Sequence, residues 1–328
     1  MFSKDQIETV LRANINFHNF NYCTRISGGY SKYSYKIFID EKQFIFQILK
    51  NPDDISGQSN ITGLEYLYPG GTKNNLESKK ILEELKILTP EIIFYDDSKN
   101  NINFDCVLQE FIEFDSFTGF EGHKRKNTLK ECLFNFGLSL GSLKNYKRSI
   151  PGDLSTFDNI FIPHKIVYSV TCDYLDISPD IPFVSNNKEK IKDTLRGLTE
   201  NIIPRNTFYL IHSDFKPDNF RFDRNGNIYW IDFESLQYFD IEFELAQFIV
   251  PDFMITNDEC FKKGYSKAIK FDIDWNRLLL YQIFRCISQI VNCSSAVITE
   301  NNKELNDKII ESNIQLLEAL INDKNKQN

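Results

Sequence analysis

The chain has 328 residues, of which 41% are hydrophobic and 26% are charged, so it is a globular protein large enough for two lobes, each with its own core. A net charge of -8 argues against a general nucleic-acid-binding protein, which usually presents a basic surface. No apolar run approaches the roughly 20 residues that a membrane span needs, and the N-terminus lacks the pattern of a signal peptide. Seven scattered cysteines without C-x-x-C spacing predict reduced thiols. These features predict a cytoplasmic protein with neither a nucleic-acid nor a membrane partner.

The N-terminal third of the sequence alternates between helical and strand patterns. Ser3 is suited to cap a helix whose apolar residues recur at helical spacing. The residues that follow alternate between apolar and polar side chains, as two antiparallel strands joined by a short turn do. The expected elements are a helix at 3–13, strands at 33–39, 43–49, 89–97 and 103–114, and a helix at 76–88. We expect these strands to belong to a five-stranded sheet.

The rest of the sequence predicts mostly helices, because apolar residues recur at helical spacing over long stretches. The first of these helices ends in Leu140-Gly-Ser-Leu143-Lys144, and we interpret it as core rather than as part of a site. Two short apolar runs, Phe208–Ile211 and Ile228–Ile231, flank turn-forming residues and predict strands. The expected helices lie at 128–146, 187–201, 239–250, 275–291 and 302–321.

Polar residues cluster directly after these two short strands. Carboxylate and amide oxygens at such positions suit a hard cation such as Mg²⁺, which binds few protein ligands and keeps its other positions for water and phosphate oxygens. The first strand is followed by His212, Asp214, Lys216 and Asn219, and the second by Asp232 and Glu234.

This arrangement resembles the catalytic core of the aminoglycoside phosphotransferase/choline kinase family, relatives of protein kinases that phosphorylate small molecules. The family pattern H-x-D-x-x-x-x-N is matched from His212 to Asn219, and the pattern I-D-(F/W)-(D/E) from Ile231 to Glu234. The resemblance implies an α+β, bilobal, protein-kinase-like fold. Its small N-terminal nucleotide-binding lobe, with an antiparallel five-stranded sheet and a helix, would span residues 1–112, and its larger, mostly helical catalytic and acceptor-binding lobe residues 113–328.

The resemblance also implies ATP and Mg²⁺ as cofactors and a role for each motif residue. Asp214 would accept or orient the proton of the acceptor hydroxyl, while Asn219 and Asp232 would hold Mg²⁺. His212 would support the loop or act as a base. Lys216 would neutralise the γ-phosphate or remain solvated.

Further residues occupy the positions where the family binds nucleotide. Gly28, Gly29 and Ser31 stand where a kinase-like fold has its phosphate-covering loop, although a Gly-Gly before a hairpin also occurs as a plain turn. The backbone of Glu110 and Ile112 stands at the position of the hinge that binds the adenine edge.

The strand at 43–49 departs from the family pattern. Gln47 occupies the position where the family has a lysine that contacts the α- and β-phosphates and pairs with a helix glutamate. Lys50 is a second candidate for this contact, and Glu77 is a candidate partner that is equally well explained as a solvated residue. Downstream, Glu244 stands where the family has an aspartate that helps to hold the catalytic loop.

The acceptor stays open among aminoglycosides, choline-like amino alcohols and sugars. A protein kinase is an alternative, but Ser213 replaces the Arg of H-R-D, Glu234 replaces the Gly of D-F-G, and no A-P-E follows. A catalytically silent nucleotide-binding module is a further alternative, suggested by Gln47. The favoured interpretation is a small-molecule kinase that transfers the γ-phosphate of ATP to a hydroxyl.

Overall fold

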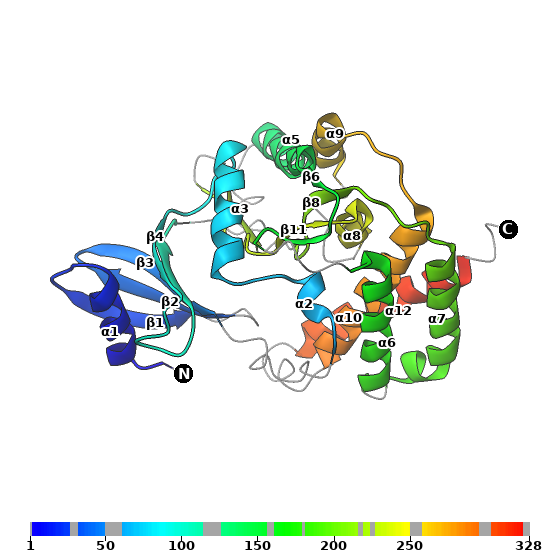
Figure 1. Ribbon diagram of the computed structural model, residues 1–328, viewed down its shortest axis with the longest axis horizontal. Coiled ribbons are helices and arrows are strands. Elements are labelled where there is room, and N and C mark those ends of the chain that lie inside the picture. The colour runs from blue at the N-terminus through cyan, green and yellow to red at the C-terminus, as the bar shows by residue number, and fades with distance from the viewer. Residues whose placement is uncertain are drawn as a thin grey trace. The chain divides into compact units, whose positions relative to one another are not determined.

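The computed structural model describes residues 2–26, 32–49, 61–113, 126–155, 161–178, 181–215, 219–223, 227–249, 258–294 and 303–323. The chain forms two compact units (Figure 1), and each is described by itself. No helix in the ranges just given is both long enough and apolar enough to cross a membrane. The predicted division into lobes at residues 1–112 and 113–328 stays a prediction. Unit 1 comprises Met1–Asn60, Gly70–Lys124 and Asp218–Glu234, and unit 2 comprises Ile61–Pro69, Arg125–Pro217 and Ser235–Asn328.

A five-stranded antiparallel sheet is the centre of unit 1, as predicted. Helix α1 (Lys4–Asn14) begins with the expected cap, because Ser3 and Gln6 form a reciprocal capping box. Its buried residues Ile7 and Val10 pack on one face of the sheet. In spatial order the strands are β1 (Phe20–Ile26), β2 (Lys32–Ile39), β3 (Lys42–Leu49), β5 (Cys106–Glu110) and β4 (Ile92–Asp96).

The register of β2 and β3 sorts their side chains between the two faces of the sheet. Tyr35 lies opposite Phe46, and both belong to the core under α1. Ser34 lies opposite Gln47, and Lys32 opposite Leu49. Because directly opposed residues share a face and neighbours along a strand alternate, Lys32 and Gln47 project from the face that α1 does not cover.

Unit 1 also contains a helix and a hairpin that is distant in sequence. Helix α3 (Thr72–Glu84) begins and ends four residues earlier than the helix predicted at 76–88. Strands β9 (Phe220–Phe222) and β10 (Ile228–Trp230) pair antiparallel. The backbone N–H of Trp230 donates to the carbonyl of Leu88 at 2.9 Å. This bond attaches the hairpin to the segment that follows α3.

Unit 2 contains a four-stranded sheet that carries the catalytic motif. The prediction of a helix over 239–250 is wrong at its start, because Phe239 lies in a strand opposite Tyr209. Phe239 is the last residue of its strand, so helix α8 (Ile241–Leu245) begins only after Asp240. The helix continues as a 3₁₀ turn at Ala246–Ile249. The strands, in spatial order, are β6 (Lys147–Arg148), β8 (Phe208–His212), β11 (Leu236–Phe239) and β7 (Gly152–Asp153).

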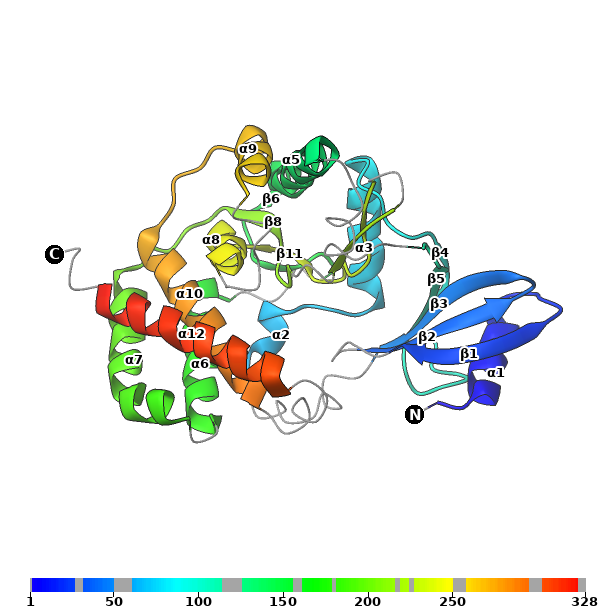
Figure 2. The same ribbon diagram turned by 180° about the vertical axis from the view of Figure 1, so that it is seen from behind.

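Helices make up most of unit 2, and its apolar core lies between α6, α7, α10 and α12. Figure 2 shows α12 lying across α10. Helices α5, α7, α10 and α12 overlap predicted helices, whereas the sequence predicted no bounded helix at α2, α6 or α9. The helices are α2 (Leu64–Leu67), α5 (Lys126–Ser142), α6 (Pro163–Ile177), α7 (Pro182–Asn201), α9 (Glu259–Ala268), α10 (Trp275–Ser294) and α12 (Lys303–Asp323).

Two glycines bring α5 and α9 into direct backbone contact. A Cβ atom on Gly137 would lie 2.1 Å from the carbonyl oxygen of Phe261, and one on Gly264 would lie 2.0 Å from that of Phe134. Only glycine permits this approach. The contact places the ring of Phe261 6.4 Å from that of Phe215, which follows the catalytic aspartate candidate in sequence. Helix α9 therefore supports the loop that carries the motif.

Candidate functional site

The loop after β8 is anchored by side chains from the α8 region. The N–H of His212 donates to Oε1 of Glu244 at 2.8 Å, and Nε2 of Gln247 donates to the carbonyl of His212 at 3.0 Å. The N–H of Phe215 donates to Oε1 of Gln247 at 2.7 Å. His212 itself is completely buried. Its burial and its bonded backbone agree with the loop-supporting role, the first of the two alternatives for this residue.

Asp214 lies between backbone groups that are fixed on both sides. The N–H and Oγ of Ser213 both donate to the carbonyl of Ser235, at 3.1 and 2.7 Å. Nη2 of Arg285 donates to the carbonyl of Ser213. Asp214 is partly exposed while its two neighbours are buried. The loop therefore presents one carboxylate from an otherwise anchored backbone, and Lys216 lies outside the described residues.

A buried charge network centres on Glu244. Nζ of Lys144 lies 2.7 Å from Oε2 of Glu244, and the hydroxyl of Tyr265 donates to the same oxygen at 3.0 Å. Lys144 is 1% and Glu244 0% exposed. Burial lowers the pKa of Lys144, an effect that Glu244 opposes. The burial of Lys144 agrees with the interpretation of this segment as core, and its ammonium neutralises the carboxylate that holds His212.

In unit 1, a buried lysine binds the two carboxylates that follow β10. Nζ of Lys32 lies 2.9 Å from Oδ1 of Asp232 and 2.7 Å from Oε1 of Glu234. Lys32 is 6% exposed. Nδ2 of Asn74, on α3, donates to the carbonyl of Glu234. The carboxylates of the second motif are thus held from both β2 and α3.

The three charged groups of this cluster shift one another's proton affinity. Burial raises the pKa of Glu234 to about 8, reinforced by repulsion from Asp232 and opposed by the Lys32 ammonium. Burial acts to lower the pKa of Lys32, but Asp232 and Glu234 together raise it above its ordinary value. The Lys32 ammonium therefore offsets part of the negative charge that the two carboxylates place at this buried position.

Asn219 and Asp232 lie at the same end of the β9–β10 hairpin. The N–H of Ile231 donates to the carbonyl of Asn219 at 3.0 Å, which brings the two candidate metal ligands to adjacent positions. An amide and a carboxylate oxygen fit Mg²⁺. No group of three or more His, Cys, Asp or Glu residues suited to a metal occurs within the described ranges. A magnesium ion at this hairpin would take its other ligands from phosphate and water, as Mg²⁺ commonly does.

The structure places the candidate nucleotide-binding residues of unit 1 in different surroundings. Gln47 is 8% exposed, on the sheet face that also carries Lys32. Glu77 is 44% exposed and pairs with Lys80 at 2.6 Å. The partner that the structure gives Glu77 is thus a neighbour on its own helix rather than a strand residue. The candidates Gly28, Gly29, Ser31 and Lys50 lie outside the described residues.

The candidate hinge follows directly from β5. Glu110 is exposed at the end of that strand, and its N–H donates to the carbonyl of Glu91 at 2.8 Å. Ile112 is half-buried. Between them, the ring of Phe111 lies beneath Lys36, whose Nζ is 3.9 Å from the ring centroid. Lys36 shares the sheet face of Lys32, because the two are separated by an even number of residues along β2.

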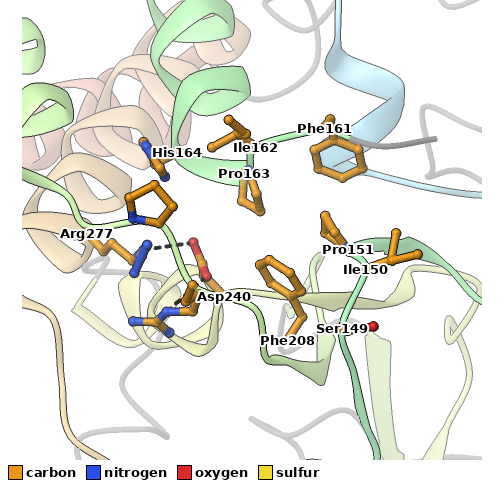
Figure 3. A pocket seen from close by; sticks show the side chains of 12 residues that line it. Ser149, Ile150, Pro151, Phe161, Ile162, Pro163, His164, Phe208, Asp240 and Arg277 are labelled. Atoms are coloured by element: carbon orange, nitrogen blue, oxygen red, sulfur yellow. Dashed lines mark ion pairs between the residues drawn. The ribbon is translucent and has the colours of Figure 1, made fainter.

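A separate pocket in unit 2 contains none of the motif residues. It has a volume of about 230 Å³ and is lined by proline, aromatic and charged side chains, among them His164, Asp240 and Arg277 (Figure 3). Nε of Arg277 lies 3.1 Å from Oδ2 of Asp240. His164 is 2% exposed, and its Nδ1 has no hydrogen-bond partner within the described part of the chain. Burial, together with the nearby Arg277, lowers the pKa of His164 to about 4.

This pKa shift predicts a loss of stability in mild acid. Between pH 6.5 and about pH 4 the unfolded state binds a proton at residue 164 that the folded state does not, so the free energy of unfolding falls as the pH falls through this range. His164 alone should lower it by about 2 kcal/mol between pH 7 and pH 5. Urea unfolding at both pH values should show a smaller pH dependence for His164→Gln than for the wild type. His18→Gln, at a side chain that is 94% exposed, is the control; equal pH dependence in His164→Gln and wild type contradicts the prediction.

Several residues that hold the motif were not found from the sequence. Arg285 is a charged residue in a strongly apolar helix, and Gln247 is a polar residue in an apolar run. Buried polar groups of this kind need partners, which is a signal that sequence reasoning can use. Lys32 follows directly after Gly28-Gly29-Tyr30-Ser31 and directly precedes the strand predicted at 33–39. A lysine between a glycine pair and a strand is the sequence signal that could have identified this residue.

The comparisons with known proteins agree with this geometry. Residues 23–281 match the model of the phosphotransferase enzyme family. Since the match spans most of the sequence, the chain belongs to this family. Comparison with curated proteins gave no significant match.

Solved structures with the same kinase-like fold cover nearly the whole chain. The spectinomycin phosphotransferase APH(9)-Ia, in complex with ADP and spectinomycin, is 16% identical and aligns over 97% of this chain and 98% of its own with a TM-score of 0.62. Aminoglycoside phosphotransferase APH(4)-Ia is 10% identical and aligns over 97% of this chain and 98% of its own with a TM-score of 0.60. APH(2")-IIia, in complex with GDP and kanamycin, is 14% identical and aligns over 99% of this chain and 100% of its own with a TM-score of 0.57. At these identities the likeness establishes the fold.

Proposed function

We propose that this protein is a small-molecule kinase that transfers the γ-phosphate of ATP to a hydroxyl group of its acceptor. The observation that carries the proposal is the anchored loop from His212 to Phe215, which leaves the Asp214 carboxylate partly exposed on a fixed backbone. Phosphoryl transfer requires mainly such positioning and charge neutralisation. Because the chain belongs to a phosphotransferase family, we interpret this carboxylate as the group that acts on the acceptor hydroxyl.

In the proposed reaction, each motif residue has one task. Asp214 accepts the proton of the acceptor hydroxyl and orients its oxygen toward the γ-phosphate. His212 keeps the loop in place through its backbone bonds to Glu244 and Gln247. Asn219 and Asp232 would hold Mg²⁺, which supplies charge neutralisation at the phosphate oxygens when it is bound. The backbone of Glu110 and Ile112 would bind the nucleotide base, and residues 28, 29 and 31 would cover its phosphates.

The acceptor class with most support is an aminoglycoside or a related polyhydroxy amine. Solved relatives bind spectinomycin, kanamycin and hygromycin B, and a net charge of -8 is compatible with a cationic acceptor. Amino alcohols and sugars remain alternatives of the same reaction type. Relatives bind both ADP and GDP, so ATP and GTP are both to be tested as donors.

A coupled ADP-release assay over aminoglycosides, amino alcohols and monosaccharides tests the proposal. We expect one of these classes to raise ADP formation well above the rate without acceptor, and mass spectrometry of the product to show one added phosphate. Binding of ATP without turnover on any acceptor would instead favour the silent nucleotide-binding module, the alternative that the neutral Gln47 suggests. The protein-kinase alternative has little support, because β11 begins at Leu236 and α8 at Ile241, which leaves no long activation segment after Glu234.

The metal assignment makes its own prediction. Asp232→Asn removes the charged candidate ligand, so the Mg²⁺ concentration that gives half-maximal ADP formation should rise by about tenfold or more. A titration of activity with Mg²⁺ measures this shift. Asp97→Asn, which makes the same chemical change at an exposed position, should leave the Mg²⁺ dependence unchanged. An unchanged requirement in Asp232→Asn would remove this residue from the metal site.

A further inference from the structure

Lys32 directly follows the candidate phosphate-covering residues in sequence. It is the first residue of β2, and Gly28 and Gly29 lie a few positions before it in sequence. On the partner strand, Gln47 lies opposite Ser34. Lys32 is therefore displaced by two residues from the position facing Gln47, about 7 Å along the strand. Its side chain starts on the same face of the sheet.

The ammonium of Lys32 occupies a position that is costly for a lysine without partners. Lysine is rarely buried in proteins unless its charge is paired, and here Nζ is held by Asp232 at 2.9 Å and Glu234 at 2.7 Å. Asp232 is the candidate ligand for the metal that accompanies the nucleotide phosphates. Lys32 therefore contacts a carboxylate that the proposed function places beside the nucleotide phosphates.

The neighbouring strand has a glutamine, not a lysine, at the position where the family contacts the phosphates. Gln47 is neutral and 8% exposed, and the residues that flank it in β3 are Phe46 and Ile48, both fully buried in the core under α1. A second lysine on the Lys32 face, Lys36, stands over the ring of Phe111 in the candidate hinge. Lys32 and Lys36 thus lie on the same face of the sheet, two residues to either side of Ser34, which faces Gln47 on the next strand.

We propose that Lys32, on β2, supplies the phosphate-anchoring positive charge that Gln47, on β3, does not carry. The proposal rests on the proposed function, since it assumes that the sheet face binds a nucleotide. Without nucleotide, Asp232 and Glu234 hold the ammonium in place. With nucleotide bound, the ammonium would bind phosphate oxygens, and Asp232 would be available to hold Mg²⁺, which would add positive charge at the phosphates. Lys32 then binds the nucleotide phosphates from β2, in place of the lysine that the family has on β3. Gln47 does not need to supply this charge.

Calorimetric titration of the full chain with ADP in the presence of Mg²⁺ tests this assignment. Charge-assisted bonds from an ammonium to phosphate predict that Lys32→Met weakens ADP binding by roughly tenfold to a hundredfold. The double variant Lys32→Met/Gln47→Lys returns a lysine to the same face from β3 and should recover about tenfold of the loss. A purely structural role for Lys32 would not be rescued from the neighbouring strand. Lys42→Met, at an exposed position on the far end of the β2–β3 hairpin, should bind ADP as the wild type does.

The outcomes separate this inference from the proposed function. Wild type that binds neither ADP nor ATP contradicts the proposed function itself. Wild type that binds ADP, with unchanged affinity in Lys32→Met, overturns the role of Lys32 alone, and so does a double variant that binds no more tightly than Lys32→Met. If Lys32→Met does not fold, Lys32→Met/Glu234→Gln removes the cation together with one buried carboxylate. Its ADP affinity then decides, and binding equal to that of Glu234→Gln overturns the proposal.

Discussion

Replacing Asp214 with asparagine should lower the rate of phosphoryl transfer by roughly a hundredfold to ten-thousandfold, the range typical for loss of a general base. The side chain keeps its size and loses its ability to take a proton. The backbone on either side is held by Glu244, Gln247 and Arg285, so the loop should keep its shape. The affinity for ADP and Mg²⁺ should therefore change by less than a few-fold.

Steady-state rates of ADP formation and calorimetric titration with ADP measure the two effects separately. Asp193→Asn, at a side chain that is 67% exposed, is the matched control and should leave both unchanged. Turnover that survives Asp214→Asn would contradict the assignment of the base. A loss of ADP binding equal to the loss of rate would show that the substitution disturbs the nucleotide site rather than the chemistry.

Replacing Lys144 with methionine should lower the free energy of unfolding by about 3–5 kcal/mol, because removal of one partner leaves a buried charge uncompensated. The uncompensated group is the Glu244 carboxylate, which is completely buried and accepts the N–H of His212. The same change should lower the rate of phosphoryl transfer, since the loop loses a firm anchor. Urea unfolding, followed by circular dichroism, measures the stability.

The control for this substitution is Lys130→Met, at an exposed position of helix α5, which directly precedes the 3₁₀ turn that carries Lys144. It should change the free energy of unfolding by less than about 0.5 kcal/mol. The double variant Lys144→Met/Glu244→Gln removes the uncompensated charge and keeps an acceptor oxygen for His212, so it should be more stable than Lys144→Met. A destabilisation of Lys144→Met below about 1 kcal/mol would contradict the view that this pair is structurally required.

The catalytic loop is the part of the site that the sequence reveals best, because its residues lie within one short stretch between two recognisable strands. The five-stranded sheet and helix α1 with its Ser3 N-cap were predictable for the same reason, because periodicity and capping are local signals. Phe239 shows the limit of local patterns. It lies in an apolar run that fits a helix, but pairing with β8 makes it part of a strand.

The supports of the site were less predictable because they are long-range. Arg285 bonds a residue 72 positions away, and Lys32 binds carboxylates 200 and 202 positions away. Periodicity carries no information about such pairs. What the sequence does offer is a set of charged residues that must be buried, such as Lys144 within an apolar helix end. Their partners became apparent only from the folded chain.

The segment Asp218–Glu234 belongs to unit 1 although residues of unit 2 flank it on both sides in sequence. During synthesis on the ribosome, β2 with its Lys32 leaves the exit tunnel long before Asp232 and Glu234, which follow 200 and 202 residues later. The nascent N-terminal sheet therefore carries an ammonium whose counter-ions do not yet exist. Cotranslational folding normally proceeds from the N-terminus, one domain at a time. In this chain the N-terminal unit cannot complete its charge balance until more than two thirds of the protein has been made, so its final assembly is a late event.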